Sequence, residues 1–268
     1  MYEPGESIPY ARADALFVHA HPDDESIDFG VLMSRLAASG KRIVSVLFTD
    51  GESGLDQFPD RPTGGIYAER DLWPEELGAV RPLETRNALS VLGATSYVRL
   101  GLKNHPYSTS RQALSNRALM SAWGGEEAIV RRLVELIEGF APRMVVSPDS
   151  AHAGAYEHFE HAGVGYVVRE ALRRVRLRGR HRVEAVLRSV DPRFRASYPE
   201  AEGIDALESI PGGAASARSV QVLALREHRT QRDATVVAVE SLTSQRRELY
   251  MADFASDAGP LDRFLRAW

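Results

Sequence analysis

The sequence predicts an α/β fold, in which a mostly parallel sheet carries helices on both of its faces. Short apolar runs alternate with segments whose apolar residues recur at three- and four-residue steps, and this alternation is typical of strand–helix–strand units. The strands are expected at about 13–19, 42–48, 96–100 and 144–147. A polar turn follows each of them, and the carboxyl ends of parallel strands meet at one rim. We therefore expect a functional site on that rim.

Helices are expected wherever the apolar residues follow the helical period. They cover about 25–38, 80–92, 109–140, the segment that starts near residue 158, and 217–231. A further strand is expected at about 183–189. The remainder to Trp268 is interpreted as helical and irregular, with Phe264 and Trp268 docked on the body.

Two polar stretches fall outside these elements. Residues 1–12 contain Pro and Gly and are expected to form an N-terminal surface arm. Residues 53–78 are rich in Gly, Pro and acids, and so long an irregular stretch is usually functional, so we expect an active-site loop or lid there. The chain shows no internal repeat and no linker, so residues 1–268 are interpreted as a single domain.

Composition narrows the class of protein. The 268 residues are 44% hydrophobic and 26% charged, which is typical of a globular protein with a full core. A net charge of −4, from 33 basic and 37 acidic residues, argues against a nucleic-acid partner. The lack of cysteine excludes disulfides, thiolate metal sites and a cysteine nucleophile. Without a signal peptide, a membrane-spanning run of roughly 20 apolar residues or a glycine-rich phosphate loop, a cytoplasmic protein without a nucleotide site is expected.

The first strand ends in the polar run H-P-D-D-E at 21–25, and a helix follows. A His near the strand end and an Asp in the first helical turn can converge on one divalent cation, which would use His21 and Asp24. Asp23, between them, is then left to point at whatever the cation holds. The competing interpretation is an ordinary helix cap, a role that suits Glu25 or the serine after it.

A second chemical cluster follows the fourth strand. Three of the eight histidines fall within ten residues, at His152, His158 and His161, and the last two share a face at the start of a helix. Chance clustering on a solvated turn is the alternative interpretation. His105, on the same rim, is expected to be a surface residue, and the arginine-rich segment 169–182 a solvated helix face.

These two clusters together resemble the motifs of the LmbE-like (PIG-L) family of zinc-dependent N-acetyl-sugar deacetylases. Residues 20–25 match the family's first motif, A-H-P-D-D-E, at every position. Its second motif usually reads Y-G-H-P-D-H, and here Tyr156, His158 and His161 match it.

Weaker landmarks of the family also fall in order, at 49–52, 81–84 and 224–231, although a Lys that is common in the family is Gln221 here. The resemblance thus covers about 13–231 as spaced motifs. It implies a Rossmann-like sheet with a metal site at the C-terminal rim of its strands.

The resemblance also implies a ligand set. His21, Asp24 and His161 would hold Zn²⁺, with Fe²⁺ or another divalent cation also suited to these ligand types. Three protein ligands leave open positions for water and substrate, as in catalytic rather than structural sites. Metal-bound water would attack the amide carbonyl, with Asp23 as the general base.

The remaining roles implied by the resemblance surround this centre. His158, with Tyr156, would stabilise the oxyanion of the tetrahedral intermediate. Either protonated Asp23 or His158 would protonate the leaving amine, and the sequence leaves both open. Glu160 would orient or tune a ligand histidine from behind.

Three residues are expected to contact substrate by the same analogy: Arg81, Asn104 and His228. Related deacetylases often carry an Asp that holds sugar hydroxyls where this chain has Asn104. An amide can still hydrogen-bond a hydroxyl, but it carries no charge. The departures from the family therefore concern the substrate more than the chemistry.

The sequence thus predicts a metal-dependent hydrolase that deacetylates, or deacylates, an N-acetylated amino sugar or sugar conjugate. Two alternatives remain, an amidase of the same family that acts on a non-sugar amide or thiol conjugate, and a non-catalytic metal- or sugar-binding protein. The expected partner is a small molecule. The acyl-amino sugar itself and the oligomeric state, a homo-oligomer included, stay open.

Overall fold

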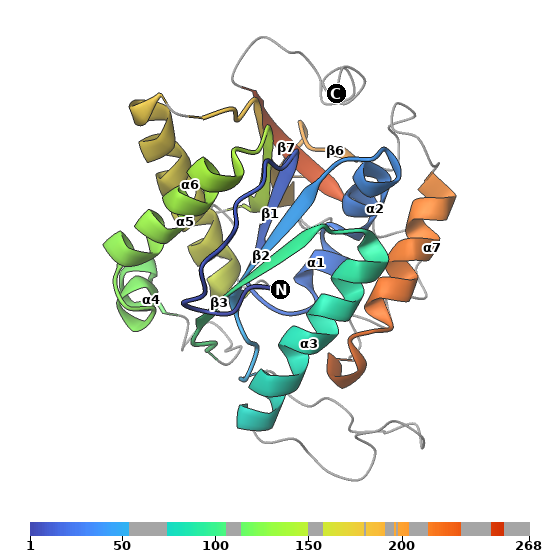
Figure 1. The fold of residues 1–268 in the computed structure, drawn as a ribbon, viewed down its shortest axis with the longest axis horizontal. Helices are drawn as coiled ribbons and strands as arrows, with labels where there is room; N and C mark the ends of the chain where they lie inside the picture. The colour runs from blue at the N-terminus through green and yellow to red at the C-terminus, as the bar shows by residue number, and fades with distance from the viewer. Residues whose placement is uncertain are drawn as a thin grey trace.

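The structure is a computed structural model, and it describes residues 1–53, 74–105, 114–149, 158–179, 181–190, 196, 198–203, 214–231 and 248–254. Within these residues, seven strands form one sheet in the order β3-β2-β1-β4-β5-β7-β6. Helices cover both faces of this sheet (Figure 1). The predicted α/β class with a mostly parallel sheet is confirmed.

Five strands run parallel, namely β1 (Ala15–His19), β2 (Ile43–Thr49), β3 (Ser96–Leu102), β4 (Met144–Pro148) and β5 (Ala185–Val190). Every residue of β1, β2 and β4 is buried, which is expected of strands covered on both faces. All five had been predicted, with boundaries that differ by one or two residues. Tyr2 of the N-terminal arm makes a bridge to Val98 and so lies along the edge strand β3.

Two strands were not predicted, β6 (Glu202–Gly203) and β7 (Leu249–Phe254). The sequence interpretation of the last part as helical and irregular is wrong for β7. This strand pairs antiparallel with β5 over its whole length, from Val190↔Leu249 to Ala185↔Phe254. The hydrogen bonds that β5 offers along its edge stabilise a strand that lacks a clear period of its own. Phe264 and Trp268 lie outside the described residues.

The helices form two layers (Figure 1). On one face lie α4 (Asn116–Ala122), α5 (Glu126–Phe140) and α6 (Phe159–Arg178). On the other lie α1 (Asp24–Ile27), α2 (Gly30–Ala38), α3 (Pro74–Leu92) and α7 (Ala214–Leu225), which a short 3₁₀ turn, η3 (Arg229–Gln231), follows. Among the helices of the described residues, none is long and apolar enough to cross a membrane.

Several predicted helix boundaries need correction. The helix α3 begins at Pro74, so the end of the loop expected at 53–78 is helical, and residues 54–73 lie outside the described part. The helix was expected to start at about residue 80, so its observed start at Pro74 places Pro82 inside α3. The helix expected at 109–140 is divided after α4, because Gly125 has a φ of 104° that a helix interior does not allow.

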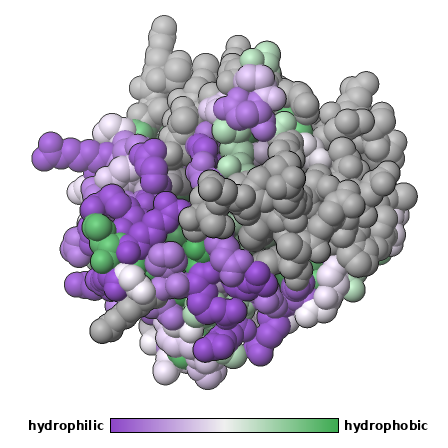
Figure 2. All heavy atoms as spheres, turned by 90° about the horizontal axis from the view of Figure 1, so that it is seen from above, coloured by the Kyte–Doolittle hydropathy of each residue, from purple (hydrophilic) through white to green (hydrophobic). Residues whose placement is uncertain are grey.

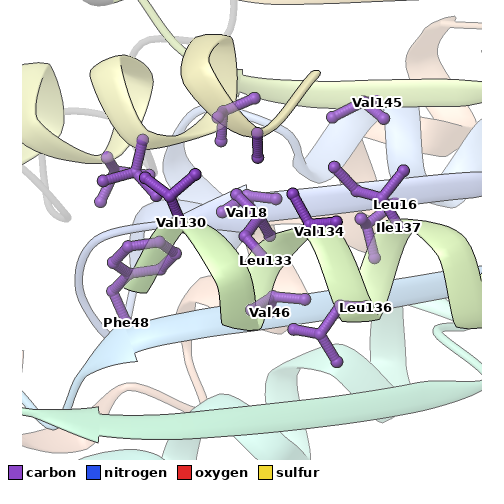
Figure 3. Close-up of a cluster of buried hydrophobic side chains, with 14 of the residues drawn as sticks. Leu16, Val18, Val46, Phe48, Val130, Leu133, Val134, Leu136, Ile137 and Val145 are labelled. Carbon is purple, nitrogen blue, oxygen red and sulfur yellow. The ribbon is translucent and has the colours of Figure 1, made fainter. Parts of the chain in front are cut away.

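The core consists of two buried clusters, one on each face of the sheet. Figure 3 shows the cluster under α5, where Val130 and Leu133 of the helix lie over Val18 of β1 and Val46 of β2. Since successive strand residues point to opposite faces, Phe17 packs into the other cluster instead. Packing on both sides therefore fixes β1, and with it the polar turn at its carboxyl end.

The arginine-rich part of α6 is a solvated helix face, as predicted. Figure 2 shows hydrophilic side chains over the described part of this side of the molecule. The arginines pair with acids of α5 and α6, for example Arg174 with Glu127 at 2.7 Å and Arg173 with Glu170 at 2.6 Å. Such exposed pairs contribute little to stability, roughly 0–1 kcal/mol each.

The predicted helix at 25–38 is broken at Asp28–Phe29 into α1 and α2. The side chain of Gln221, from α7, donates to the carbonyl groups of Ser26 at 2.8 Å and Ile27 at 3.2 Å. These carbonyl groups lie at the end of α1, where helical partners are lacking. The break could not be read from the local sequence, because its partner lies about 195 residues away.

The start of α2 is capped from even further along the chain. Both carboxylate oxygens of Glu248 accept backbone N–H groups, from Val31 at 2.6 Å and Leu32 at 3.0 Å. A carboxylate at a helix N-terminus satisfies these donors and opposes the positive end of the helix dipole. Glu248 is 6% exposed, so it also holds the region before β7 against α2.

We expect Glu248→Gln to lower the free energy of unfolding by about 1–3 kcal/mol, because one of the two charge-assisted hydrogen bonds is lost. Chemical denaturation monitored by circular dichroism measures this change. The matched control is Glu135→Gln on the exposed face of α5, where a change below about 0.5 kcal/mol is expected. Equal effects of the two substitutions would contradict the capping role of Glu248.

Candidate metal centre and active site

The turn that follows β1 is stabilised by hydrogen bonds between the Asp24 side chain and backbone N–H groups of the turn. The Oδ2 atom of Asp24 accepts hydrogen bonds from the backbone N–H groups of Ala20 at 3.1 Å and His21 at 2.8 Å. Asp23, at the N-cap of α1, has a φ of 103°, in the left-handed region that non-glycine residues avoid. Such a conformation costs on the order of 1–3 kcal/mol and clusters at functional sites.

Three side chains that the sequence grouped come together at this turn. The Nδ1 atom of His21 lies 3.1 Å from Nε2 of His161, and that Nε2 lies 3.3 Å from Oδ1 of Asp24. The Nδ1 atom of His21 is 3.5 Å from Oδ2 of Asp24. Potential ligand atoms of all three lie within 4.8 Å of one another. Two imidazole nitrogens and one carboxylate oxygen form a donor set that fits Zn²⁺ or a similar cation.

The electrostatics of this group favour a positive charge at its centre. Burial lowers the pKa of His21, but Asp24 and Glu160 outweigh burial and raise it above the usual value. Burial raises the pKa of Asp24, but the charges and hydrogen bonds of His161 and His21 hold it well below the usual value. The same negative potential that retains a proton on His21 would attract a divalent cation.

A second candidate group shares His21 and adds His158 and Glu160. Glu160 Oε2 lies 2.7 Å from His21 Nε2, which makes Nε2–H the donor. A neutral imidazole carries one proton, so its lone pair is then at Nδ1, on the side of Asp24 and His161. A carboxylate behind a ligand histidine is common in metal sites. This geometry therefore favours the group formed by His21, Asp24 and His161.

Glu160 is fully buried and accepts several hydrogen bonds besides that of His21. Asn104 donates its Nδ2–H at 2.7 Å, and His105 donates its backbone N–H at 2.9 Å and contacts the same oxygen through Nδ1 at 2.8 Å. Burial raises the pKa of Glu160, but His21 and the other donors lower it to about 2, so this carboxylate is ionised.

The hydrogen bonds of Glu160 locate two residues differently from what the sequence suggested, His105 and Asn104. His105 is not a free surface residue, because its ring nitrogen binds Glu160. Asn104 is 3% exposed, and its Oδ1 accepts the backbone N–H of Ser53 at 3.0 Å. The Asn104 side chain therefore faces Glu160 and the loop instead of the open rim, where a substrate contact was expected.

His158 caps α6. Its Nδ1 accepts the backbone N–H of Glu160 at 3.3 Å, so its other nitrogen carries the proton and donates to the backbone carbonyl of His105 at 2.9 Å. Burial lowers the pKa of His158 to about 3, with a further contribution from the nearby His21. The ring is therefore neutral, and it packs edge-on against His21 at 4.6 Å between ring centroids. Tyr156 and His152 lie outside the described residues.

Asp23 is the carboxylate beside the ligand group. Burial raises its pKa above the usual range, Arg81 opposes this, and Asp24 adds to it. Asp23 can therefore take up a proton closer to neutral pH than an ordinary Asp, which suits a general base.

Arg81 lies beneath the turn and not on the open rim. It is 4% exposed, and it donates to the carbonyl groups of Pro22 and Gly51, both at 2.7 Å, and to Asp23 at 3.3 Å. Gly51 has a φ of 72°, and a Cβ there would collide with the Arg81 guanidinium. The positive φ and the close approach of Arg81 therefore explain why the turn after β2 contains glycine.

His228 also lies behind the turn. The predicted helix 217–231 ends at Leu225, so His228 is not on a helix face that reaches the rim. Its Nε2 lies 2.6 Å from Oε1 of Glu25, and both side chains are fully buried. Glu25 does accept the N-cap N–H of Asp23 at 3.1 Å, as expected of a cap, but its pairing with His228 had no local signal.

Comparison with known proteins places this geometry in context. Residues 16–172 match the family model PIG-L, described as GlcNAc-PI de-N-acetylase. The chain is 34% identical over 151 residues to a 1D-myo-inositol 2-acetamido-2-deoxy-alpha-D-glucopyranoside deacetylase of Catenulispora acidiphila, covering 54% of this chain and 46% of that protein. A relative from Nocardia farcinica with the same activity in its name is 33% identical over 178 residues, covering 63% and 55%. The chain spans about half the length of the curated relatives it matches.

Solved structures resemble the whole fold. The N,N'-diacetylchitobiose deacetylase from Pyrococcus horikoshii aligns with a TM-score of 0.56 and 17% identity, over 90% of this chain and 84% of that one. The zinc-inhibited form of a teicoplanin deacetylase aligns with a TM-score of 0.56 and 17% identity, over 91% and 99%. At this level of identity the likeness concerns the fold.

We expect His161→Ala to lose tight binding of a divalent cation, because the group is left with one nitrogen and one carboxylate. Asp23→Ala is expected to retain the cation, since Asp23 is not part of the ligand group. Metal analysis of protein dialysed against Zn²⁺ measures both. Loss of metal from Asp23→Ala, with retention by His161→Ala, would show that the ligands are assigned wrongly.

Glu160→Gln is expected to weaken metal affinity by about 10- to 100-fold, because a neutral amide orients His21 less well. Competition with a chromophoric chelator measures the affinity. Glu170→Gln, ten residues further along the same helix and away from the ligand group, serves as the control and should not change the affinity. An unchanged affinity in Glu160→Gln would exclude the orienting role.

Proposed function

The chain belongs to the PIG-L family, and from this premise we propose that it is a metal-dependent hydrolase that removes the acyl group from an N-acetylated amino sugar or sugar conjugate. The observation that carries the proposal is the strained, half-buried Asp23 next to the group of His21, Asp24 and His161. A carboxylate held beside three ligands serves no purpose in simple metal storage. It suits a reaction in which water must lose a proton.

In this proposal His21, Asp24 and His161 hold the cation, with Zn²⁺ as the first choice and Fe²⁺ suited to the same donors. A cation bound there would supply Lewis acidity, polarising the amide carbonyl and lowering the pKa of water. Glu160 keeps the proton of His21 at Nε2, so that Nδ1 is available as a ligand. The donor set and the hydrogen bond behind it support this assignment.

Asp23 takes the proton of the attacking water and then delivers it to the leaving amine nitrogen. Its raised pKa and its place beside the ligands support both steps. His158 is the other candidate for the second step. Its one N–H is engaged with the His105 carbonyl, and its low pKa leaves the ring neutral, without a second proton to give, so we assign both transfers to Asp23.

The substrate class follows from the relatives. The two curated proteins are named as deacetylases of an inositol-linked N-acetylglucosamine, so an N-acetylated amino sugar conjugate is the first substrate to test for this chain. The expected contacts Arg81, Asn104 and His228 are each almost fully buried. We therefore propose that these three residues support the site from behind and that other groups on the rim meet the sugar.

The test measures free-amine release from metal-stripped protein with and without Zn²⁺. The panel contains N-acetylglucosamine, its inositol conjugate, N,N'-diacetylchitobiose and a non-sugar N-acetyl amide. We expect Zn²⁺ to restore release from at least one sugar, and Asp23→Asn to lower kcat by about 10²- to 10⁴-fold, because proton transfer is lost.

The outcomes separate the alternatives. Release only from the non-sugar amide would favour an amidase with a different substrate. No release from any compound, with metal bound, would favour a binding protein. Turnover in Asp23→Asn close to that of the wild type would overturn the mechanism but leave the family intact.

A further inference from the structure

The backbone of Asp23 is held in a conformation that its sequence does not favour. Its φ is 103°, and the Asp23 side chain makes no capping hydrogen bond of its own. A residue stays in this region only where surrounding groups hold it there. The groups that do so in this structure lie behind the turn, on the side away from the rim.

Glu25 binds the amide of the strained residue. One of its oxygens accepts the backbone N–H of Asp23 at 3.1 Å. The other accepts the hydroxyl of Ser26 at 2.7 Å and lies 2.6 Å from His228 Nε2. Glu25 and His228 are each 0% exposed, so neither side chain can touch a bound substrate.

His228 is in turn docked by the same helix that supplies Arg81. Two residues after His228, Thr230 donates both its backbone N–H, at 3.0 Å, and its hydroxyl, at 2.6 Å, to the buried Glu84. Glu84 lies three residues after Arg81 on α3, and Arg81 donates to the Asp23 carboxylate. The Asp23 N–H is thus held through Glu25 and His228, and the Asp23 carboxylate is held by Arg81. Both sets of contacts depend on α3.

We propose that Glu25 and His228 form a buried pair of positioning residues, which holds the backbone of Asp23 in its left-handed conformation, next to the ligand residue Asp24. The inference rests on the proposed function, since Asp23 is the general base there. A buried ion pair can also serve stability alone, and this is the interpretation that the experiment must separate.

The decisive substitution is Glu25→Gln. The carboxylate accepts donors at both oxygens, and an amide replaces one of these acceptors with an N–H₂ donor. Either Asp23 N–H or His228 then loses its acceptor. We expect kcat to fall about tenfold or more, since small misplacements of a catalytic group are costly, while KM and bound metal stay within about twofold of the wild type.

The matched control is Glu248→Gln, which makes the same change in a buried carboxylate that also accepts backbone N–H groups, but at the start of α2. It is expected to lower the melting temperature without changing kcat per metal-loaded protein. Equal losses of kcat in the two variants would show that Glu25 acts through general stability, and this would overturn the proposal.

A double-mutant cycle with Asp23→Asn then tests whether Glu25 acts through Asp23. If it does, Glu25→Gln lowers kcat in the wild-type background and has no further effect once Asp23 is replaced. Equal fold-losses in both backgrounds would overturn the proposal. His228→Gln is run in parallel and is expected to follow the same pattern, which keeps the test available if Glu25→Gln does not fold.

One readout does not depend on turnover. Crystal structures of the wild type and of Glu25→Gln are expected to differ at Asp23, whose φ should leave the left-handed region in the variant. An unchanged Asp23 φ and carboxylate position would overturn the positioning role even if the enzyme is active. Absence of amine release from the wild type, together with the expected shift of Asp23, would count against the proposed function alone.

Discussion

The hydrogen bond between His21 Nε2 and Glu160 is the interaction on which the rest of the site depends. It joins the turn after β1 to the first turn of α6, two segments that lie 139 residues apart. Because one imidazole carries one proton, this bond decides which nitrogen faces Asp24 and His161. The parallel pairing of β1 with β4 brings the two segments to the same rim. The topology of the sheet therefore determines which nitrogen of His21 carries the proton.

The centre is built from ionisable groups that would be costly to bury singly. Each acid is met by several donors: Glu160 by a histidine ring, an amide and a backbone N–H, and Asp24 by two backbone N–H groups. These partners come from separate segments, so the arrangement forms only when the surrounding elements are in place. Rigidity at the rim follows from this interlocking, because no one side chain can turn without leaving a buried charge without its partner.

The sequence was sufficient for what depends on local pattern. The parallel strands follow from short apolar runs, and the pair of His21 and Asp24 follows from a polar turn at a strand end. His161 joined them as a ligand through the resemblance to the family motifs. What could not be predicted depends on partners far along the chain. The strand β7 forms because β5 offers an edge, and the break before α2 forms because distant side chains satisfy its ends. Arg81 and His228 were expected at the rim, but both are buried behind the turn. Their burial also depends on distant partners, and it leaves no periodic signal in the sequence.

The order in which the parts of the site occur along the chain bears on how the protein is made. All three candidate ligands are present by residue 161, within the span 16–172 that matches the family model. His228, which braces the turn from behind through Glu25, comes some 70 residues later. A nascent chain therefore carries its complete ligand set well before His228, the last of the supports of Asp23, has been synthesised. During translation, cation capture can precede the assembly of a competent active site.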